Sequence, residues 1–372
     1  MRVLILTCNA GGGHTAAAKA LKETFDKEGI YCEIADSLAF FSQKVSNFIS
    51  KWHVRLYKNA PMLFGYGYKK AEKIYGKHKR SMLYETICKG AKKLRDKAVS
   101  DNIDTVICTH PFSAMTLTRA MKKYHLKLDK TYFVATDYTC SPGVGTSDLD
   151  YYIIPHKDTI NDFVSQGVRP ERIVVHGIPV SPRVHMALSK EESKKKLSLP
   201  TDKKLILLMC GSMGCGPLKF IARELSSALK EDEQLVVICG TNHRLYKKLE
   251  ELDIPGRVRI LGFSNNVPLY MNSADLMLTK PGGLSTTEAA ENHLPMILID
   301  AVSGCETHNM RFWTESGMAK TREKTSELCT LVRELMDNPK DLDDMRETLT
   351  ENFPENSSER IFKFIKQNSA SK

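Results

Sequence analysis

Short apolar runs alternate along the chain with longer segments in which apolar residues recur at helical spacing. Each run is followed by a glycine-containing or polar turn. This alternation is typical of βαβ units, in which crossover helices join the strands of a parallel sheet. In the first half of the chain, the predicted strands are residues 3–8, 105–108, 132–135, 151–154 and 173–175.

The same alternation restarts after a lysine-rich segment of helical character at residues 189–198, which we take as the joint between two domains. The predicted strands beyond it are residues 205–210, 235–239, 258–261, 275–279 and 296–299. We therefore predict an α/β protein with two doubly wound, Rossmann-like domains, 1–185 and 200–352. We also predict a C-terminal helix within 355–372 that packs back on the first domain. Ligands of such sheets bind at the carboxyl ends of the strands, so we expect the two domains to face a central cleft.

The composition agrees with a folded protein of two domains. A chain of 372 residues is longer than one hydrophobic core usually supports, and 42% hydrophobic with 26% charged residues is ordinary for a folded protein. The ten cysteines form no CxxC pair, so we expect reduced thiols in the cytoplasm. The chain starts on an apolar strand without a signal segment, and no run reaches the about 18 to 20 apolar residues that span a membrane. We therefore expect any membrane contact to be peripheral.

The formal net charge of +10 is concentrated in one segment. Between Phe41 and Lys97 the chain has fifteen Lys and Arg residues against three acidic ones, a net of +12 that leaves −2 for the rest. Basic helices with interleaved aromatic residues lie on anionic lipid surfaces, so we predict contact with the inner face of the cell membrane. A solvated basic face over an aromatic core is the alternative. No nucleic-acid partner is expected, because no nucleic-acid-binding motif accompanies the charge.

A glycine-rich loop joins the first predicted strand to the helix that follows it. Gly12 and Gly13 allow the backbone to approach a ligand closely, and the helix start offers N–H groups to an anion. His14 stands where the helix dipole disfavours the imidazolium and leaves a neutral ring able to accept a proton. We therefore consider His14 a candidate general base, with an exposed or capping histidine as the alternative.

The same loop also satisfies the dinucleotide pattern GxGxxA. Gly11, Gly13 and Ala16 fill its positions, and Asp36 stands near the expected acidic position. Tight glycine turns recur in α/β proteins without a dinucleotide, so this pattern alone is weak. An NAD-dependent dehydrogenase stays an alternative that rests on this loop.

A second glycine turn follows the predicted strand at 275–279. Backbone N–H groups at a helix start bind phosphate, so we predict a diphosphate site here. Glu288, on the helix behind the turn, is placed to accept hydrogen bonds from ribose hydroxyls. The alternative is a capping box between Ser285 and Glu288. The candidate residues are Lys280, Gly282, Gly283, Ser285, Thr286 and Glu288.

Three more turns at strand ends add to this candidate site. Each alone is an ordinary strand-to-helix turn, and their common place at carboxyl ends favours a ligand. They contribute Gly211, Ser212, Asn242, Gly262 and Phe263. We expect no catalytic metal, because the His and Cys spacings fit no zinc site and the DxD at Asp148 and Asp150 is a common accident. The chain lacks the Walker A loop and the GxSxG elbow, which argues against P-loop NTPases and serine hydrolases.

Six short motifs occur in order along most of the chain. They are residues 11–14 (GGGH), 108–111 (CTHP), 136–137 (TD), 177–180 (GIPV), 262–263 (GF) and 279–283 (TKPGG). In this order they resemble the monogalactosyldiacylglycerol synthases and the bacterial processive diacylglycerol glucosyltransferases, relatives of the N-acetylglucosaminyltransferase that makes lipid II. The resemblance implies a GT-B fold, a UDP-sugar donor on the C-terminal domain, a lipid acceptor on the N-terminal domain, and inversion without a metal or other cofactor.

The resemblance also assigns roles position by position. It implies that His14 and Asp137 are catalytic and that Glu306 and Asn309 contact the donor sugar. The acceptor-side residues would be Gly12, Gly13 and His110. The glutamine that the family carries beside the glutamate is Cys305 here, which leaves the donor sugar open. The stretch 138–142 lacks the family's tryptophan and histidine, which leaves the acceptor open as well.

The function that these patterns favour is transfer of a hexose from a UDP-sugar to a membrane lipid, with diacylglycerol as the expected acceptor. The alternatives are a transferase that uses UDP-N-acetylglucosamine, a UDP-N-acetylglucosamine 2-epimerase, and a non-catalytic UDP-sugar sensor. An epimerase acts on a soluble nucleotide sugar and has no use for the basic aromatic segment. A sensor would keep Glu288 while His14 could be lost.

Overall fold

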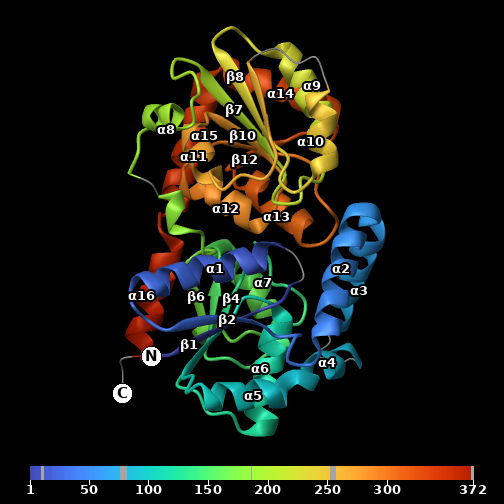
Figure 1. The fold of residues 1–372 in the computed structure, drawn as a ribbon, viewed down its shortest axis with the longest axis vertical. Coiled ribbons are helices and arrows are strands. Elements are labelled where there is room, and N and C mark those ends of the chain that lie inside the picture. Colours follow the sequence, from blue (N-terminus) through green and yellow to red (C-terminus); the bar gives the residue numbers. More distant parts are fainter. Residues whose placement is uncertain (10–11, 76–81, 186, 252–256, 370–372) are drawn as a thin grey trace. The chain divides into compact units, whose positions relative to one another are not determined.

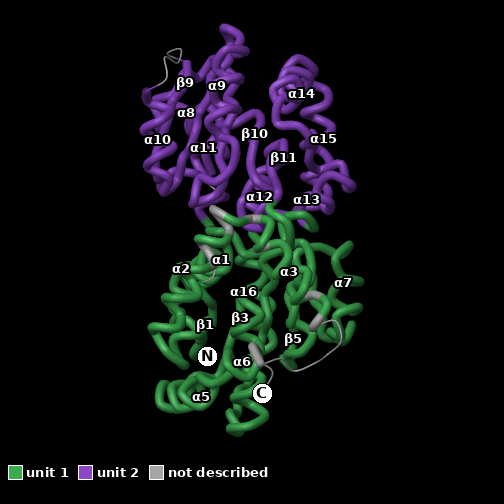
Figure 2. The backbone as a smooth tube through the Cα atoms, turned by 90° about the vertical axis from the view of Figure 1, so that its right-hand side faces the viewer, with its two compact units in different colours: residues 1–182, 302–308, 356–372 green, residues 183–301, 309–355 purple. Residues whose placement is uncertain are grey.

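The computed structural model describes residues 1–9, 12–75, 82–185, 187–251 and 257–369. Their contacts divide the chain into two compact units, coloured green and purple in Figure 2. Unit 1 comprises residues 1–182, 302–308 and 356–372, and unit 2 comprises residues 183–301 and 309–355. The chain therefore passes between the units several times and ends in unit 1.

Unit 1 is built on a sheet of six parallel strands (Figure 1). They are β1 (Val3–Thr7), β2 (Cys32–Asp36), β3 (Thr105–Cys108), β4 (Lys130–Val134), β5 (Tyr151–Ile154) and β6 (Ile173–Val175). Their order in space is β2-β1-β3-β4-β5-β6. The strand order reverses between β1 and β3, and doubly wound sheets bind ligands at this switch point.

The described helices of unit 1 connect these strands or follow them. They are α1 (Gly12–Lys27), α2 (Gln43–Asn59), α3 (Pro61–Tyr75), α4 (Met82–Ile87), α5 (Ala91–Ser100), α6 (Pro111–Tyr124), α7 (Ile160–Ser165) and α16 (Ser357–Ser369). Successive side chains of a strand point to opposite faces. Val3 and Ile5 accordingly pack with residues of α1 and α16, whereas Leu4 and Leu6 pack with residues of α5 and α6. Burial on both faces explains why β1 is apolar at consecutive positions.

Unit 2 repeats this plan with a different strand order. Its strands are β7 (Lys204–Met209), β8 (Glu233–Ile238), β9 (Val258–Leu261), β10 (Leu276–Thr279), β11 (Met296–Leu298) and β12 (Ala319–Thr321). All pairings are parallel, in the order β12-β11-β10-β7-β8-β9. Here the order reverses between β7 and β10, as in dinucleotide-binding sheets.

The helices of unit 2 lie on both faces of its sheet. They are α8 (Lys190–Lys196), α9 (Leu218–Ala228), α10 (His243–Glu250), α11 (Val267–Ser273), α12 (Gly283–Glu291), α14 (Thr325–Asp337) and α15 (Pro339–Asn352), with α13 (Cys305–Glu315) beginning in the part of the chain that belongs to unit 1. The lysine-rich α8 starts with a capping box between Ser189 and Glu192 and packs on α11. Trp313, the largest fully buried side chain, stacks on Phe353 with ring centroids 4.8 Å apart.

The predicted class, an α/β protein with two parallel sheets, is confirmed. All ten predicted strands are present, and the prediction missed β2 and β12. Both lie at the edge of a sheet and most of their residues are only partly buried. An edge strand covered on fewer sides needs no continuous apolar run, which is why neither stands out in the sequence.

The basic segment between Phe41 and Lys97 divides into two parts with different packing. α2 and α3 lie side by side in Figure 1, and both expose apolar side chains. By contrast, α4, α5 and the turn between them bury Ile87 and Leu94 in the core of unit 1. The exposed fractions on α2 and α3 are 60% for Phe48, 47% for Trp52, 88% for Met62, 58% for Leu63 and 68% for Tyr66. Among the described residues of the segment, those of α2 and α3 therefore have the exposed apolar surface that the prediction expects.

Part of that segment, residues 76–81, lies outside the described residues, as do the side chains of Tyr57, Phe64 and Tyr75. Among the helices that are described, none combines the length and the apolarity needed to cross a bilayer. The ten cysteines, all within the described ranges, form no disulfide.

Candidate functional site

In unit 1, three neighbouring strands bring predicted site residues to one edge of the sheet. His14 lies in the first turn of α1, which follows β1, and His110 lies two residues beyond the end of β3. Asp137 follows β4, the next strand along the sheet. His14 and His110 therefore stand on the two sides of the switch point between β1 and β3.

His14 is held by two oxygen atoms from the neighbouring strands. Its Nδ1 lies 2.8 Å from the backbone carbonyl oxygen of Thr109 and 2.7 Å from Oγ1 of Thr136. The Thr109 hydroxyl in turn donates to the carbonyl oxygen of His14 at 3.1 Å. The ring is partly buried and its orientation is fixed from two strands, which does not fit the alternative of a merely exposed histidine.

His110 is the N-cap of α6 and is almost fully buried. Its Nδ1 accepts a hydrogen bond of 3.0 Å from the backbone N–H of Phe112. The ring stands edge-to-face to that of His14, with centroids 4.5 Å apart and 73° between the planes. The two predicted residues are thus in direct contact.

The glycines of the first loop leave space beside His14. A Cβ added to Gly13 would meet no atom within 4 Å, so packing within this chain does not require glycine there. Gly12 is the exposed first residue of α1. Both features suit a loop that another molecule approaches.

Asp36, the acidic residue of the dinucleotide pattern, has a local role. Its Oδ1 accepts from the backbone N–H of Leu38 at 3.0 Å. Its Oδ2 accepts from Nδ2 of Asn9 at 3.2 Å and from the Ser46 hydroxyl. These bonds hold the turn after β2, which removes support from the dinucleotide alternative, and Gly11 of that pattern lies outside the described residues.

In unit 2, the turn after β10 places a helix start at the other switch point. Gly282 is the N-cap of α12 and makes no side-chain capping bond. The proposed capping box between Ser285 and Glu288 is therefore wrong, because Ser285 is already inside the helix. The first three N–H groups of α12, from Gly283 to Ser285, are those that an α-helix leaves without an intrahelical acceptor. They are the groups that could bind a phosphate.

Thr286 supports this turn from within. Its side chain is fully buried, and its hydroxyl donates to the backbone carbonyl oxygen of Gly282 at 3.0 Å. Its backbone N–H donates to the same oxygen at 3.1 Å. The structure thus gives Thr286 a local role, and its contact with a phosphate stays a prediction.

Glu288 lies in the second turn of α12, on the helix behind the glycine turn as predicted. Burial raises the pKa of its carboxyl group to about 7, and the neighbouring Glu291 carboxylate adds to the rise. Near neutral pH the group can therefore change its charge, a property shared by many ligand-binding carboxylates.

Lys280 at the end of β10 is nearly buried, and its Nζ lies 3.5 Å from Oδ2 of Asp300. Gly216, with a positive φ of 127°, lies against both side chains: a Cβ at this position would stand 3.4 Å from Cε of Lys280. The ammonium group is therefore placed beside the glycine turn that follows β7, close to the switch point between β7 and β10.

The turns after β7 and β8 are packed backbone against backbone. A Cβ on Gly240 would lie 2.4 Å from the carbonyl oxygen of Ser212, and the N–H of Thr241 donates to that oxygen at 2.8 Å. The Asn242 amide donates from Nδ2 to the oxygen of Gly214 at 2.8 Å, and its Oδ1 caps α10 by accepting from the N–H of Leu245 at 3.1 Å. Asn242 thus joins the two turns.

The remaining predicted donor residues differ in exposure. Phe263, which follows β9 and Gly262, is 62% exposed. Asn309 is fully buried and donates to the carbonyl oxygen of Pro281 at 2.9 Å. Glu306 accepts from the N–H of Val302 at 2.8 Å. Of these three side chains, the phenyl ring of Phe263 is exposed, whereas Asn309 and Glu306 stabilise backbone turns through hydrogen bonds.

Cys305, which stands where the resemblance implies a glutamine, lies in unit 1 at the start of α13. Burial raises the pKa of its thiol well above the ordinary value, and the nearby carboxylates of Asp137 and Glu306 raise it further. The group is therefore a neutral thiol at physiological pH. A thiol is a weaker hydrogen-bond donor than the amide it replaces.

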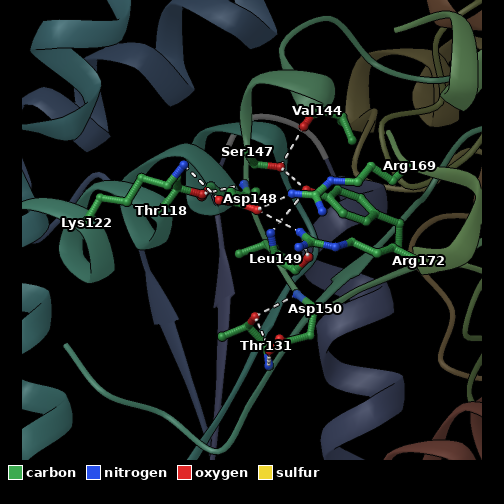
Figure 3. A network of polar contacts seen from close by, with 12 residues as sticks. Thr118, Lys122, Thr131, Val144, Ser147, Asp148, Leu149, Asp150, Arg169 and Arg172 are labelled. Atoms are coloured by element: carbon green, nitrogen blue, oxygen red, sulfur yellow. Dashed lines mark hydrogen bonds and ion pairs between the residues drawn. The ribbon is translucent and has the colours of Figure 1, made fainter. Parts of the chain in front are cut away.

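The DxD pair of unit 1 is engaged by other groups, as Figure 3 shows. Asp148 forms ion pairs with Lys122 at 2.7 Å and with Arg172 at 2.6 Å. Asp150 accepts hydrogen bonds from the backbone N–H and the hydroxyl of Thr131. No group of three His, Cys, Asp or Glu side chains within the described ranges could hold a metal ion. A metal-free reaction stays a prediction.

The sequence analysis missed two residues of the unit 1 site. Thr109 and Thr136 stood inside quoted motifs but received no role, although Thr109 directly follows β3 and Thr136 lies two residues beyond the end of β4. That position was the available signal, because residues after adjacent parallel strands meet at one edge. What the sequence could not give was which of their atoms contact His14.

Two family models match the chain: Monogalactosyldiacylglycerol (MGDG) synthase over residues 14–180, and Glycosyl transferases group 1 over residues 189–352. The chain is 30% identical over 352 residues to the Processive diacylglycerol beta-glucosyltransferase of Bacillus mycoides, covering 94% of this chain and 89% of that protein. It is 29% identical over 364 residues to the protein of the same name from Bacillus licheniformis, covering 96% and 93%.

Solved structures share the fold at lower identity. The crystal structure of Acinetobacter baumannii MurG has a TM-score of 0.64 at 16% identity and covers 99% of this chain and 100% of that one. Anabaena HepE in complex with UDP-glucose has a TM-score of 0.58 at 13% identity, with the same coverage. These similarities confirm the predicted GT-B fold. With a relative at 30% identity over nearly its whole length, the chain belongs to the family of the diacylglycerol glycosyltransferases that includes the processive diacylglycerol beta-glucosyltransferases.

Proposed function

We propose that this glycosyltransferase moves a hexose from a UDP-sugar to diacylglycerol at a membrane surface, with inversion at the anomeric carbon. The observation that carries the proposal is the position of His14, whose ring is held at Nδ1 at the switch point of unit 1. The relatives that the chain matches over nearly their whole length are named processive diacylglycerol beta-glucosyltransferases. UDP complexes among proteins of the same fold agree with the donor class.

In the proposed reaction the hydroxyl oxygen of diacylglycerol attacks the anomeric carbon of the sugar. The new carbon–oxygen bond forms as the bond from that carbon to the phosphate oxygen breaks, and UDP leaves with the electron pair. The hydroxyl proton passes to the imidazole of His14. A positioned base of this kind contributes about 10² to 10⁴ in rate.

The donor belongs to unit 2 in this proposal. The N–H groups at the start of α12, from Gly283 to Ser285, bind the diphosphate, whose negative charge grows as it leaves. The Lys280 ammonium, which lies beside the glycine turn that follows β7, adds positive charge. Glu288 accepts hydrogen bonds from the ribose, and the exposed ring of Phe263 stacks on the base.

The membrane contact is assigned to α2 and α3. Phe48 and Trp52 are exposed neighbours on α2, with ring centroids 5.9 Å apart. Among the described side chains of the same helix, the exposed basic residues are Lys44, Lys51 and Arg55. A helix with aromatic and basic exposed side chains binds in the interface of an anionic bilayer. The enzyme is thus proposed to act as a peripheral protein on the inner face of the cell membrane.

The test is a transfer assay with purified protein and anionic vesicles that contain diacylglycerol. Radiolabelled UDP-glucose, UDP-galactose and UDP-N-acetylglucosamine are offered separately, and label in the lipid phase is measured. We expect label from a UDP-hexose, and His14→Ala protein serves as the matched control. UDP binding without transfer to any lipid would favour a sensor, and epimerised UDP-N-acetylglucosamine would favour an epimerase. A protein that binds no UDP would refute the proposal.

A further inference from the structure

His14 and His110 stand edge-to-face, and each is held at Nδ1 by a main-chain group. The two main-chain groups have opposite chemistry. One is a carbonyl oxygen, which can only accept a hydrogen bond, and the other is an N–H, which can only donate one. The partners therefore decide where each neutral ring carries its single proton.

For His14, the partner of Nδ1 is the carbonyl oxygen of Thr109 at 2.8 Å. A nitrogen lone pair facing that oxygen at this distance would be repelled, so Nδ1 carries the proton. The hydroxyl oxygen of Thr136, 2.7 Å from the same nitrogen, is a second acceptor. The lone pair of the neutral ring is then at Nε2, where the ring can take a proton and keep both contacts.

For His110, the partner of Nδ1 is the backbone N–H of Phe112 at 3.0 Å. Nδ1 must therefore hold the lone pair, and the proton of the neutral ring is at Nε2. Protonation of Nδ1 would break the bond that caps α6. His110 is thus suited to donate a hydrogen bond from Nε2 and is not suited to accept a proton.

We propose that the fold holds these adjacent histidines in opposite neutral tautomers, with His14 as the proton acceptor and His110 as a hydrogen-bond donor to the reacting oxygen atoms. Thr136 is a positioning residue, because it acts on the reaction through Nδ1 of His14. The consequence for turnover rests on the proposed function. The assignment of the tautomers does not.

The tautomers are measurable in the full-length protein. Nitrogen chemical shifts of protein labelled with ¹⁵N-histidine distinguish a protonated from an unprotonated ring nitrogen. His14→Gln and His110→Asn assign the signals, and asparagine retains a capping oxygen for α6. We expect a protonated Nδ1 for His14 and a protonated Nε2 for His110 above the pH at which the rings lose their charge. The same tautomer in both rings would overturn the proposal.

The role of Thr136 is tested with a matched pair of variants. Thr136→Val removes the oxygen at nearly constant shape, and Thr136→Ser retains it. We expect Thr136→Val to lower kcat about tenfold, the effect of one hydrogen bond, and to leave KM for the UDP-sugar unchanged. It should also reduce the fraction of His14 protonated at Nδ1, while Thr136→Ser stays close to wild type. Equal effects of both variants would refute a role of the hydroxyl.

The two proposals fail in distinguishable ways. Opposite tautomers together with normal turnover of His14→Ala would refute the proposed base and leave the assignment intact. Loss of turnover in His14→Ala together with identical tautomers would support the proposed base and refute the assignment of the tautomers.

Discussion

The two units place their candidate sites at equivalent points of similar sheets and fill them with different chemistry. At the switch point of unit 1, two titratable rings are held at Nδ1, that of His14 by oxygen atoms of Thr109 and Thr136 and that of His110 by a backbone N–H at the start of α6. At the switch point of unit 2, glycines with positive φ allow close approach, of Gly214 to the backbone of Cys239 and of Gly216 to the side chain of Lys280. The topology determines where a ligand binds, and the residues after the strands determine what happens to it.

The difference fits a division of work between proton transfer and anion binding. A proton acceptor must be a side chain with a defined tautomer, which needs fixed hydrogen-bond partners. A diphosphate is bound well by backbone N–H groups, which need close approach and therefore glycine. Substitutions in unit 1 should accordingly affect turnover, and substitutions in unit 2 should affect affinity.

The strongest test of this division substitutes one residue in each unit and compares the two variants. We expect His14→Ala to lower kcat by about 10² to 10⁴ and to leave UDP affinity unchanged, because the lost group acts on the proton. Glu288→Ala should weaken UDP binding in calorimetry and change kcat at saturating donor much less. Loss of UDP affinity in His14→Ala would contradict the division.

The charge of Glu288 gives a pH-dependent test of the unit 2 site. Burial raises its pKa to about 7, so the carboxylate fraction grows from about one tenth at pH 6 to about nine tenths at pH 8. Since a carboxylate accepts hydrogen bonds from ribose better than the neutral acid does, UDP affinity should rise by up to about tenfold over this range. Glu288→Gln is the matched control, because any pH dependence that comes from the titration of UDP itself remains in this variant. Identical pH profiles of both proteins would argue against a ribose contact.

A third test asks whether membrane binding belongs to unit 1 alone. We expect Lys51→Gln, which removes one positive charge, to weaken binding to anionic vesicles about fivefold, the effect of about 1 kcal/mol for one basic residue. Trp52→Ser should weaken binding through lost apolar contact. Phe220→Ser is the control, since Phe220 is an exposed aromatic residue of unit 2. Sedimentation with vesicles measures all three, and an equal loss in the control would contradict the assignment to α2 and α3.

The sequence was sufficient to predict the strands and the turns that carry the sites, because buried parallel strands are continuous apolar runs with ligand residues at their carboxyl ends. The family resemblance implied a catalytic His14 and an acceptor-side His110 without pairing them, and the structure puts their rings in contact. The sequence did not reveal the partners at Nδ1, because Thr109 and Thr136 are distant in the chain and each contributes a single atom.

The sequence also could not separate ligand residues from residues that brace a turn. Asn242 and Asn309 are polar residues of the predicted donor site, and a ligand contact was the natural interpretation. In the structure their amides donate to the backbone oxygens of Gly214 and Pro281. The sequence shows which type of residue stands at a turn. The direction of its side chain depends on the neighbouring turn, which the sequence does not show.

Asn242 offers the smallest but most discriminating test, because it stands in the unit 2 site with both ends of its amide in use. Asn242→Ala removes the cap of α10 and the bond to Gly214, so we expect a loss of about 1 to 2 kcal/mol in the stability of unit 2. For a unit of this size, that lowers Tm by about 2 to 4 °C per kcal/mol in scanning calorimetry. Asn242→Asp, which keeps the capping oxygen, should recover part of the loss. A bracing role predicts little change of UDP affinity below the transition, whereas reduced affinity at unchanged Tm would mean that the Asn242 amide touches the donor.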